Sequence, residues 1–477
     1  MNVLIVDAPE VLQRSLADAF GSRGDTCRML PEQRTDVTTR GDASTQPRPG
    51  VPARLGQIAA DAHGIDCVVV FAHDPAAEAR TSATAAAALA GSNVSRLIIV
   101  TPLRGSRQPD ATSTPAQRHA PAEHPIDVTV VAATPVYGPG DELVSRLLIM
   151  MRSLPIVPLL ANGDRQYQPL WHEDLAHVLV EAAHGNEAVG PTCAVAGPQA
   201  VTQQELYDRI APLIDKRPAR VPVPDLLTRV GLKLIDAASG TDTASAEGRW
   251  AVDADAVVLS AADNDLERVL GRPATSLDEG LRRLVVELPE QLPGTGLGTL
   301  QVKHFWADLR GHHLAPREVI GLLRDRFADI MPVPVGIEPG APTVRLDVGA
   351  TITLHLPGRG HVQVRVEEAD DAHVVLSTLR GHPLAGVVRF LAAPAAEGVR
   401  FEVMTADRAA TPLDWLGLSI GGARLQDANW RTVVRRVADM AEATIDGVQS
   451  HVRDASDAEV EHLSMWVRRL VTGQREA

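Results

Sequence analysis

The chain has 477 residues, 45% of them hydrophobic but only 3% aromatic, which predicts two or three mainly aliphatic cores. Its formal net charge is −14, from 46 basic and 60 acidic residues, so a nucleic-acid partner is not expected. No apolar run could cross a bilayer, no signal peptide is evident, and Cys27, Cys67 and Cys193 form no disulfide or metal pattern. We therefore expect a cytoplasmic protein with no integral membrane segment and no metal site.

Apolar strands alternate with helices in the first part of the chain. The residue pattern predicts helices at 11–20 and 76–90, and strands at 2–6, 27–30, 65–71, 97–100 and 126–132. Strands joined through helices pair in parallel, with right-handed crossovers. We therefore predict a doubly wound parallel sheet of the Rossmann type over residues 1–290.

Three motifs in this part resemble one known family. They are VYGPGD at 136–141, GDRQYQP at 163–169 and HEDLAHVL at 172–179. They are similar to the late strand, substrate loop and following helix of the extended or atypical short-chain dehydrogenase/reductases, the group of the NAD-dependent epimerases and dehydratases. The resemblance implies a dinucleotide-binding domain, with NAD(P) as the possible cofactor and an oxidoreductase or epimerase activity.

The turn after the first strand departs from that family. The family has three glycines there, which let backbone N–H groups approach the pyrophosphate. Here Asp7, Glu10 and Gln13 take the three glycine positions. A carboxylate about 4 Å from a phosphate charge costs roughly 4 kcal/mol at an effective dielectric near 20. Either Asp7 and Glu10 form a capping box on the helix itself, or the turn is a distorted but working cofactor site.

The other residues that the family uses for chemistry are mostly missing. Arg28 could meet a cofactor 2′-phosphate, or it could be a solvated surface charge. Thr101 matches the family's hydroxyl residue, but the stretch 107–123, where its Tyr and Lys should fall, contains neither. Thr101 and Tyr137 are the catalytic candidates that remain. Hydride transfer by the usual mechanism is therefore not expected, and neither is a bound cofactor, although NAD(P) stays the alternative.

Four residues are predicted to line a substrate site: Tyr137, Tyr167, Gln168 and His172. Together with Trp171 they should lie at the substrate end of the first domain, where a concave site suits a small molecule. Each also has a purely structural interpretation. Tyr137 could be a packed loop aromatic, His172 a hydrogen-bonded loop histidine and Asp174 a helix cap.

After a linker predicted at 291–300, the pattern changes to that of an antiparallel sheet. A helix is predicted at 316–327 and a long helix at 425–451, with strands between them at 344–347, 351–356, 361–367, 373–379, 387–392 and 399–405. This order resembles the START-like (SRPBCC) helix-grip proteins, so residues 301–477 are predicted to enclose an apolar ligand. Capping boxes are predicted at Thr202 to Glu205 and at Ser456 to Glu459.

These expectations give three hypotheses for function. In the first, the protein is related to the dehydrogenases, has degenerate motifs and binds a small apolar or amphipathic ligand as a carrier, sensor or scaffold. In the second, it is an active NAD(P)-dependent oxidoreductase or epimerase with an unusual phosphate loop. In the third, it is an assembly subunit that binds another protein, and a homodimer is also open.

Overall fold

The computed structural model describes most of the chain, namely residues 1–30, 64–72, 89, 93–103, 126–141, 143–153, 156–160, 163–164, 166–223, 258–311, 313–332, 335–336, 345–356, 360–411, 414–415 and 423–472. The predicted helix at 76–90, apart from Leu89, and the stretch 107–123 lie outside these residues. Within the described residues, no helix is both long and apolar enough to cross a membrane.

The chain divides into two compact units. The first comprises Met1–Ser145, Asn162–Leu206 and Thr243–Leu281, and the second comprises Arg146–Ala161, Tyr207–Asp242 and Arg282–Ala477. Two segments from the first half of the sequence therefore belong to the same unit as the C-terminal residues. The predicted division of the chain at 291–300 stays a prediction.

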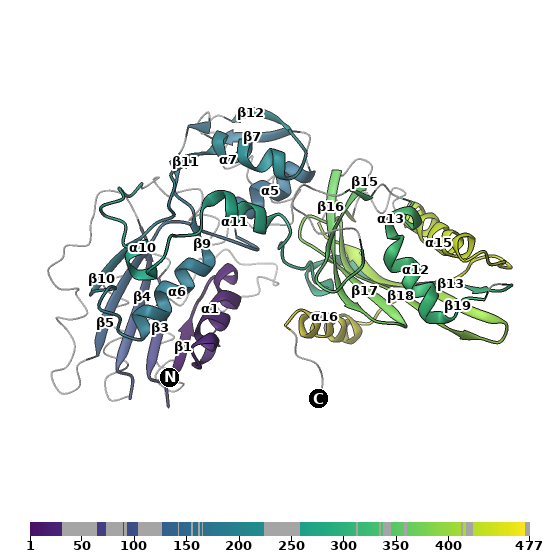
Figure 1. Cartoon of the computed structure of the whole chain (residues 1–477), viewed down its shortest axis with the longest axis horizontal. Helices are drawn as coiled ribbons and strands as arrows, with labels where there is room; N and C mark the ends of the chain where they lie inside the picture. The colour runs from purple at the N-terminus through teal and green to yellow at the C-terminus, as the bar shows by residue number, and fades with distance from the viewer. Residues whose placement is uncertain are drawn as a thin grey trace, which may run out of the picture. The chain divides into compact units, whose positions relative to one another are not determined.

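The first unit contains a six-stranded sheet in the order β10-β5-β4-β3-β1-β2 (Figure 1). All of its strand pairs are parallel. The strands are β1 (Asn2–Val6), β2 (Thr26–Leu30), β3 (Cys67–Phe71), β4 (Arg96–Pro102), β5 (Asp127–Ala133) and β10 (Thr192–Val195). The strand order turns back beside β1, which places a topological switch point at the carboxyl ends of β1 and β3. The predicted Rossmann-like fold is confirmed.

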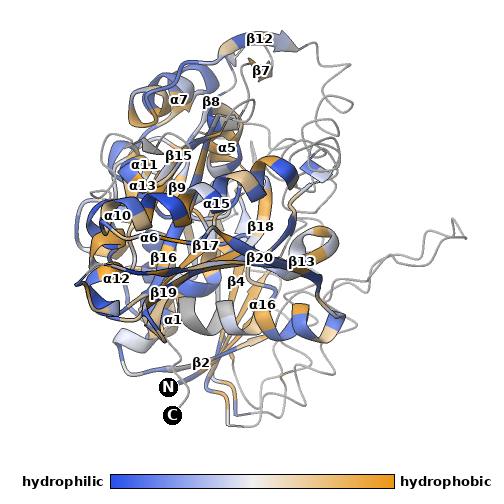
Figure 2. Ribbon diagram, turned by 90° about the vertical axis from the view of Figure 1, so that its right-hand side faces the viewer, coloured by the Kyte–Doolittle hydropathy of each residue, from blue (hydrophilic) through white to orange (hydrophobic). Residues whose placement is uncertain are grey.

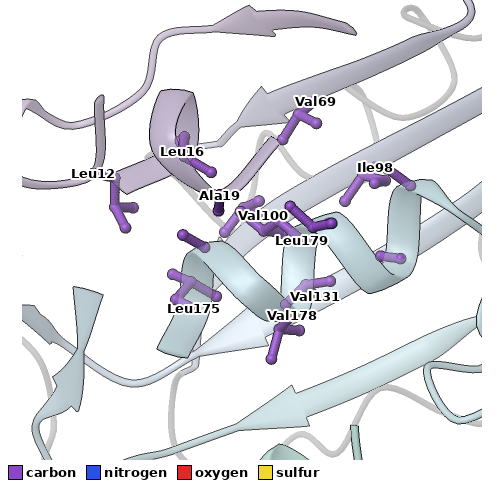
Figure 3. Close-up of a cluster of buried hydrophobic side chains, with 14 of the residues drawn as sticks. Leu12, Leu16, Ala19, Val69, Ile98, Val100, Val131, Leu175, Val178 and Leu179 are labelled. Atoms are coloured by element: carbon purple, nitrogen blue, oxygen red, sulfur yellow. The ribbon is translucent and has the colours of Figure 1, made fainter. Parts of the chain in front are cut away.

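Apolar layers cover both faces of this sheet. On one face lie α1 (Glu10–Ser22), α6 (His172–Ala183) and α10 (Leu266–Leu270). Figure 3 shows Leu12 and Leu16 of α1 and Leu175 and Leu179 of α6 packed against Val100 and its strand neighbours. The alternate strand residues, such as Leu4, Val68 and Leu97, are buried in a second cluster with Leu89. The strands are therefore buried on both faces, as is usual for parallel strands.

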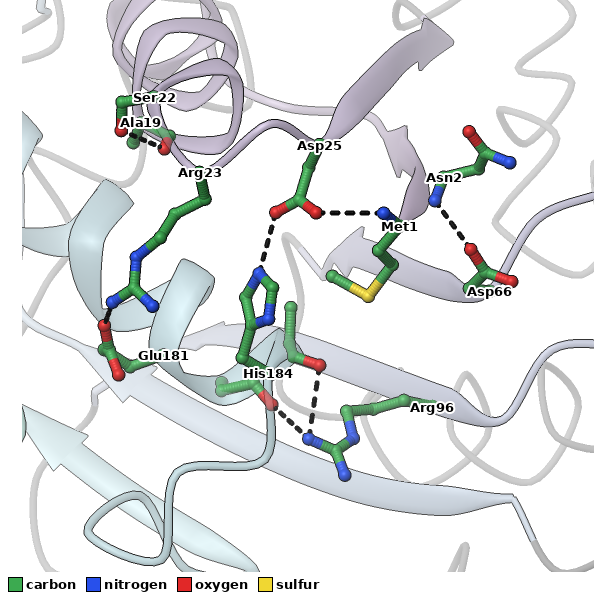
Figure 4. Close-up of polar contacts among 12 residues, drawn as sticks. Met1, Asn2, Ala19, Ser22, Arg23, Asp25, Asp66, Arg96, Glu181 and His184 are labelled. Atoms are coloured by element: carbon green, nitrogen blue, oxygen red, sulfur yellow. Dashed lines mark hydrogen bonds and ion pairs between the residues drawn. The ribbon is translucent and has the colours of Figure 1, made fainter.

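Polar contacts join the elements at the amino ends of the strands (Figure 4). His184, at the end of α6, lies 2.7 Å from a carboxylate oxygen of Asp25, just before β2. Arg96 donates to the carbonyl of Ala182, and the Asn2 amide donates to Asp66. Burial raises the pKa of Asp25. The hydrogen bond with His184 and the amino group of Met1 lower this pKa by more, so the net pKa lies below its usual value.

The remaining elements before residue 285 are short. They are β6 (Val136–Tyr137), α5 (Val144–Ser153), β7 (Ile156–Leu160), β8 (Gln166–Tyr167), β9 (Leu170–Trp171), β11 (Val201–Thr202), α7 (Gln203–Ile210), η2 (Ala211–Leu213), β12 (Ala219–Val223) and α11 (Leu277–Leu284). The predicted box before α7 is confirmed, because the Thr202 amide donates to Glu205 and the Glu205 amide donates to the Thr202 hydroxyl, at 2.7 and 3.2 Å. β7 and β12 form a parallel pair within the second unit.

The second unit has an eight-stranded antiparallel sheet in the order β14-β15-β16-β17-β18-β19-β13-β20. Its strands are β13 (Leu297–Leu309), β14 (Val335–Gly336), β15 (Thr351–Leu356), β16 (Gly360–Ala369), β17 (His373–Thr378), β18 (Leu384–Ala395), β19 (Gly398–Ala409) and β20 (Gln449–Asp454). The other elements are η3 (Pro293–Thr295), α12 (Pro316–Asp325), α13 (Phe327–Ile330), α15 (Ala423–Met440) and α16 (Asp457–Thr472). α12, α13 and α15 share one apolar core with the sheet. This antiparallel sheet with a long helix packed on it confirms the predicted α+β class.

Two predictions for this unit are wrong, and two strands were not predicted. The first of these strands is β13, which begins at Leu297. The helix predicted at 425–451 ends at Met440, because Glu442 has a positive φ of 53° that no helix continues. The chain then forms β20, all of whose residues are exposed and which is mostly hydrophilic in Figure 2. The strand predicted at 344–347 is not formed by the described residues 345–347.

The sheet face away from α15 carries several polar side chains that bind chain from the same unit. Arg152 of α5 donates to Gln363 of β16 at 2.9 Å and to the carbonyl of Val285 at 2.6 Å. Thr351 donates to the carbonyl of Val286, and Arg365 forms an ion pair with Glu290. The hydrogen-bonding side chains of this face are thus used to hold the segment from Val285 onward against the sheet.

Candidate functional site

The turn between β1 and α1 lies at the switch point, where a doubly wound sheet usually binds its ligand. Asp7, the first residue after β1, is buried and has a positive φ of 57°. Its amide donates to the carbonyl of Leu30 at 3.1 Å. Asp tolerates this left-handed backbone better than most residues other than glycine. The turn therefore keeps a backbone that suits glycine while adding a carboxylate.

The capping box predicted for Asp7 and Glu10 is wrong in its register. Helix α1 begins at Glu10 and its N-cap residue is Pro9. An N-cap residue has an extended backbone, which the positive φ of Asp7 excludes. Glu10 is the first residue of the helix rather than the third, and its side chain is exposed.

The start of α1 has few backbone donors to offer. Pro9 has no N–H, and the Leu12 amide donates to the Pro9 carbonyl at 2.9 Å. Gln13, at the third glycine position, donates its side-chain amide to the carbonyl of Ala8 at 3.1 Å. A bound pyrophosphate needs free amides and close backbone approach at this end of the helix. These residues do not fit a pyrophosphate as a glycine turn would.

The other two residues considered for cofactor or catalysis lie within strands. Arg28 is exposed and pairs with Leu4 in the middle of β2, two residues before the strand ends at Leu30. Thr101 is buried in β4, opposite Ala132 of β5. Thr101 is thus near the carboxyl edge of the sheet, whereas the backbone of Arg28 lies further from that edge. Their roles stay predictions.

Tyr137, Trp171 and His172 are brought together, as predicted. β6 and β9 pair in parallel, with Tyr137 opposite Trp171. Their rings are 5.1 Å apart, and the rings of Trp171 and His172 are 4.3 Å apart, both edge-on. The His172 Nδ1 lies 3.1 Å from the Ser15 hydroxyl of α1. This aromatic cluster therefore links the strands β6 and β9 to α1, the helix that follows β1.

The aromatic cluster is tightly packed. Tyr137, Trp171 and His172 are each less than a tenth exposed. A Cβ added at Gly138 would collide with the His172 ring, and one at Gly280 of α11 would collide with the Tyr137 hydroxyl. The two glycines are required because these side chains lie directly against the backbone there.

The other two predicted substrate residues have different described contacts. Tyr167 is buried in β8, which pairs with β11. Gln168 donates to the carbonyl of Gly197 at 2.9 Å and accepts from the amide of Leu259 at 2.8 Å. The side-chain amide of Gln168 therefore holds two distant loops together.

Two aspartates have roles that the sequence analysis missed or misassigned. Asp141 is buried and accepts from the amides of Leu143, Val144 and Ser145 at 2.6–2.9 Å, so it caps α5. Burial raises the pKa of Asp141, and these hydrogen bonds oppose the rise. The position of Asp141 just before a helical pattern was the signal that could have revealed its capping role. Asp174 was expected to be a cap, but it is the third residue of α6 and binds Arg272 at 2.7 Å.

Neither a protein-family model nor a curated protein matches this sequence. Among solved structures, MoeE5 in complex with UDP-glucose and NAD is 16% identical, with 60% of this chain and 97% of that chain covered and a TM-score of 0.41. TunA, an NAD-dependent NDP-hexosamine 5,6-dehydratase involved in tunicamycin biosynthesis, is 15% identical, with 60% and 96% covered and a TM-score of 0.41. The UDP-glucose 4-epimerase of Thermotoga maritima with UDP-glucose is 14% identical, with 60% and 97% covered and a TM-score of 0.39. At these values the matches carry no argument about chemistry, and the fold rests on its own strand order.

Proposed function

We propose that this chain is related to the short-chain dehydrogenase/reductases but does not work as an ordinary dinucleotide enzyme. It binds a small apolar or amphipathic molecule through its C-terminal, START-like part and acts as a carrier, sensor or scaffold. The observation that supports the proposal best is the turn after β1, where Asp7, Pro9 and Gln13 replace the features that hold a pyrophosphate.

The electrostatic argument concerns the first residues after β1. The positive end of a helix dipole stabilises a phosphate at its N-terminus. At α1, a buried carboxylate precedes the helix and a second carboxylate is its first residue. Acidic side chains at this place lower the potential that a dinucleotide would meet. Pro9 removes a donor at the same place.

The argument for the second unit rests on its apolar layer. The core between α15 and the sheet is built from large side chains such as Phe305, Phe390 and Phe401. One end of that layer instead contains buried Lys303 and Asp407. A layer that is apolar along most of its length and polar at one end matches a molecule with an apolar body and a polar head.

Dinucleotide titration tests the first part of the proposal. Wild-type protein is expected to show no saturable binding of NADH or NADPH by isothermal calorimetry up to about 1 mM, which corresponds to about −4 kcal/mol. The triple variant Asp7→Gly, Glu10→Gly, Gln13→Gly should gain at least about tenfold in affinity, because it restores the close backbone approach.

Two further results decide the interpretation of this titration. Asp18→Gly adds a glycine to an exposed site of the same helix and should leave dinucleotide affinity unchanged. Tight binding by the wild type would instead support the active oxidoreductase or epimerase. A triple variant that folds, as judged by circular dichroism, but gains no affinity would show that this turn is not what limits binding.

A further inference from the structure

A group of charged and polar side chains lies between the sheet of the second unit and the first turns of α15, with its strand residues buried and its helix residues partly exposed. Lys303 of β13 is 3% exposed and Asp407 of β19 is 7% exposed. Gln426 and Asp427 of α15 complete this group, which we call the Lys303 cluster. Lysine and aspartate are seldom so deeply buried unless they are fully paired.

The pairing within the Lys303 cluster is incomplete. Lys303 Nζ donates to Gln426 Oε1 at 2.5 Å, and Gln426 Nε2 donates to Asp407 Oδ2 at 2.9 Å. Asp427 Oδ1 lies 3.7 Å from Lys303 Nζ, too far for a direct hydrogen bond. The ammonium group of Lys303 has three N–H donors. Among the described residues, Gln426 Oε1 is the one acceptor within hydrogen-bond distance. The buried Asp427 Oδ1 has no donor among the same residues.

A third buried polar atom, Nε1 of Trp430 on α15, belongs to the same helix–sheet layer. Trp430 follows Gln426 by four residues, so the two lie on one side of α15, about 6 Å apart along its axis. The Trp430 ring packs edge-on against Phe390 of the sheet, at 6.1 Å. Its indole Nε1 is buried and has no acceptor among the described residues. Lys303 and Trp430 are therefore two donors that face the helix–sheet layer.

The charge balance limits what could bind there. Burial raises the pKa of Asp407, and the charge of Lys303 opposes the rise. The cluster thus places two carboxyl side chains, Asp407 and Asp427, near a single lysine. An added carboxylate would bring a third acidic group beside that lysine, and burying a further charge is costly. A hydroxyl group is neutral, accepts from an ammonium and donates to a carboxylate.

We propose that the Lys303 cluster anchors the hydroxyl group of a neutral long-chain alcohol, which accepts from Lys303 and donates to Asp427. The apolar chain of that molecule lies along the α15 side of the core, beside Trp430. The side chain of Asp427, in the first turns of α15, is 41% exposed, so the cluster reaches the surface on that side. This inference rests on the proposed function and specifies the ligand class of its second part.

The test uses three probes with the same chain length: 1-decanol, decanoate and 1-methoxydecane, the last of which accepts but cannot donate. Wild-type protein is expected to bind 1-decanol at least about tenfold more tightly than either of the others in native mass spectrometry. Lys303→Met should reduce 1-decanol binding to the level of 1-methoxydecane. Trp430→Phe, which removes only the Nε1 donor and part of a ring, should weaken it by about threefold or more.

Trp306→Phe is the matched control. Trp306 lies on β13, but its side chain stacks on His304, on the face of the strand opposite Lys303 and Phe305. It should leave the affinity for all three probes unchanged.

The outcomes separate this inference from the proposed function. Equal binding of 1-decanol and 1-methoxydecane, unaffected by Lys303→Met, overturns the anchor but leaves the ligand-binding function intact. Tightest binding of decanoate overturns the choice of a neutral alcohol. If none of the probes binds, both the anchor and ligand binding in the second unit fail. If Lys303→Met does not fold, the comparison of 1-decanol with 1-methoxydecane in the wild type still decides whether the hydroxyl donates to the cluster.

Discussion

Asp25 shows how one buried side chain can connect several elements of the parallel sheet. Its carboxylate lies 2.7 Å from His184 Nε2, which joins the start of β2 to the end of α6. The net effect of its surroundings is a lowered pKa, so the folded state favours the ionised form. A carboxylate with a lowered pKa stabilises the fold above its ordinary pKa and loses that contribution as the pH falls through the lowered value.

Replacing Asp25 should therefore change stability in a pH-dependent way. We expect Asp25→Asn to lower the free energy of unfolding at pH 7 by about 1–3 kcal/mol, the range for a hydrogen bond to a charged group. The difference between wild type and variant should shrink as the pH falls from about 4 toward 2. Urea denaturation at a series of pH values measures it.

The control for Asp25 is the carboxylate of Asp66, which lies at the same edge of the sheet in an exposed hydrogen bond with the Asn2 amide. Asp66→Asn should shift stability by less than about 1 kcal/mol. If the stability curves of wild type and Asp25→Asn run parallel over the whole pH range, the ionised carboxylate of Asp25 contributes nothing specific.

At the scale of elements, the sequence predicted what local patterns encode. The strand at Asn2–Val6 and the boxes at Thr202 and Ser456 were predicted correctly, because a few neighbouring residues determine them. The strand β13 was missed because Pro and Gly precede it and because a lysine occupies one of its buried positions. β20 was missed because every one of its residues is exposed, so no alternation marks it. Its partner β13 alone places it in the sheet.

The predictions for the candidate site succeeded and failed for the same reasons. Tyr137, Trp171 and His172 meet because two short strands in one motif pair beside each other. Gln168 belongs to the same motif, yet its side chain binds loops at Gly197 and Leu259 that no local pattern connects to it. The capping box at Asp7 failed because spacing alone does not reveal a positive φ.

The confirmed box before α7 provides a direct test of helix capping. Thr202→Ala removes a side-chain acceptor from the first turn and should lower the free energy of unfolding by about 1 kcal/mol. Glu205→Ala should cost a similar amount, and the double variant should cost less than the sum, because both residues belong to one reciprocal pair. Denaturant titration measures all three variants.

Asp18→Ala is the comparison for these capping variants. Asp18 is a helical carboxylate with an exposed side chain, and its ion pair with Arg14 is long, at 3.9 Å. Its removal should change stability by less than about 0.5 kcal/mol. Additive losses in the Thr202 and Glu205 variants would mean that the two residues stabilise α7 independently.

At the scale of the whole molecule, the second unit is built from distant parts of the chain. Arg152 belongs to the segment Arg146–Ala161, yet its guanidinium bonds with Gln363 and with the carbonyl of Val285. These partners are buried, so removing the guanidinium leaves polar groups without their hydrogen bonds.

Arg152→Met should therefore loosen the second unit selectively. We expect hydrogen exchange to rise by about tenfold or more in β16 and in residues 282–291, while β1 and β3 of the first unit stay as protected as in wild type. Arg345→Met, which removes exposed ion pairs in the same unit, should change little. Unchanged exchange in β16 would show that Arg152 does not hold these segments together.

The position of β13 between β19 and β20 has a consequence for how the protein is made. β13 ends at Leu309, but the strands on its two sides begin only at Gly398 and Gln449. Pairing between residues so far apart closes large loops and is slow. During synthesis, β13 leaves the ribosome long before either neighbour exists, with both of its backbone edges exposed. The interval before β19 and β20 arrive is therefore when the nascent chain is most open to aggregation, and when a chaperone has most to protect.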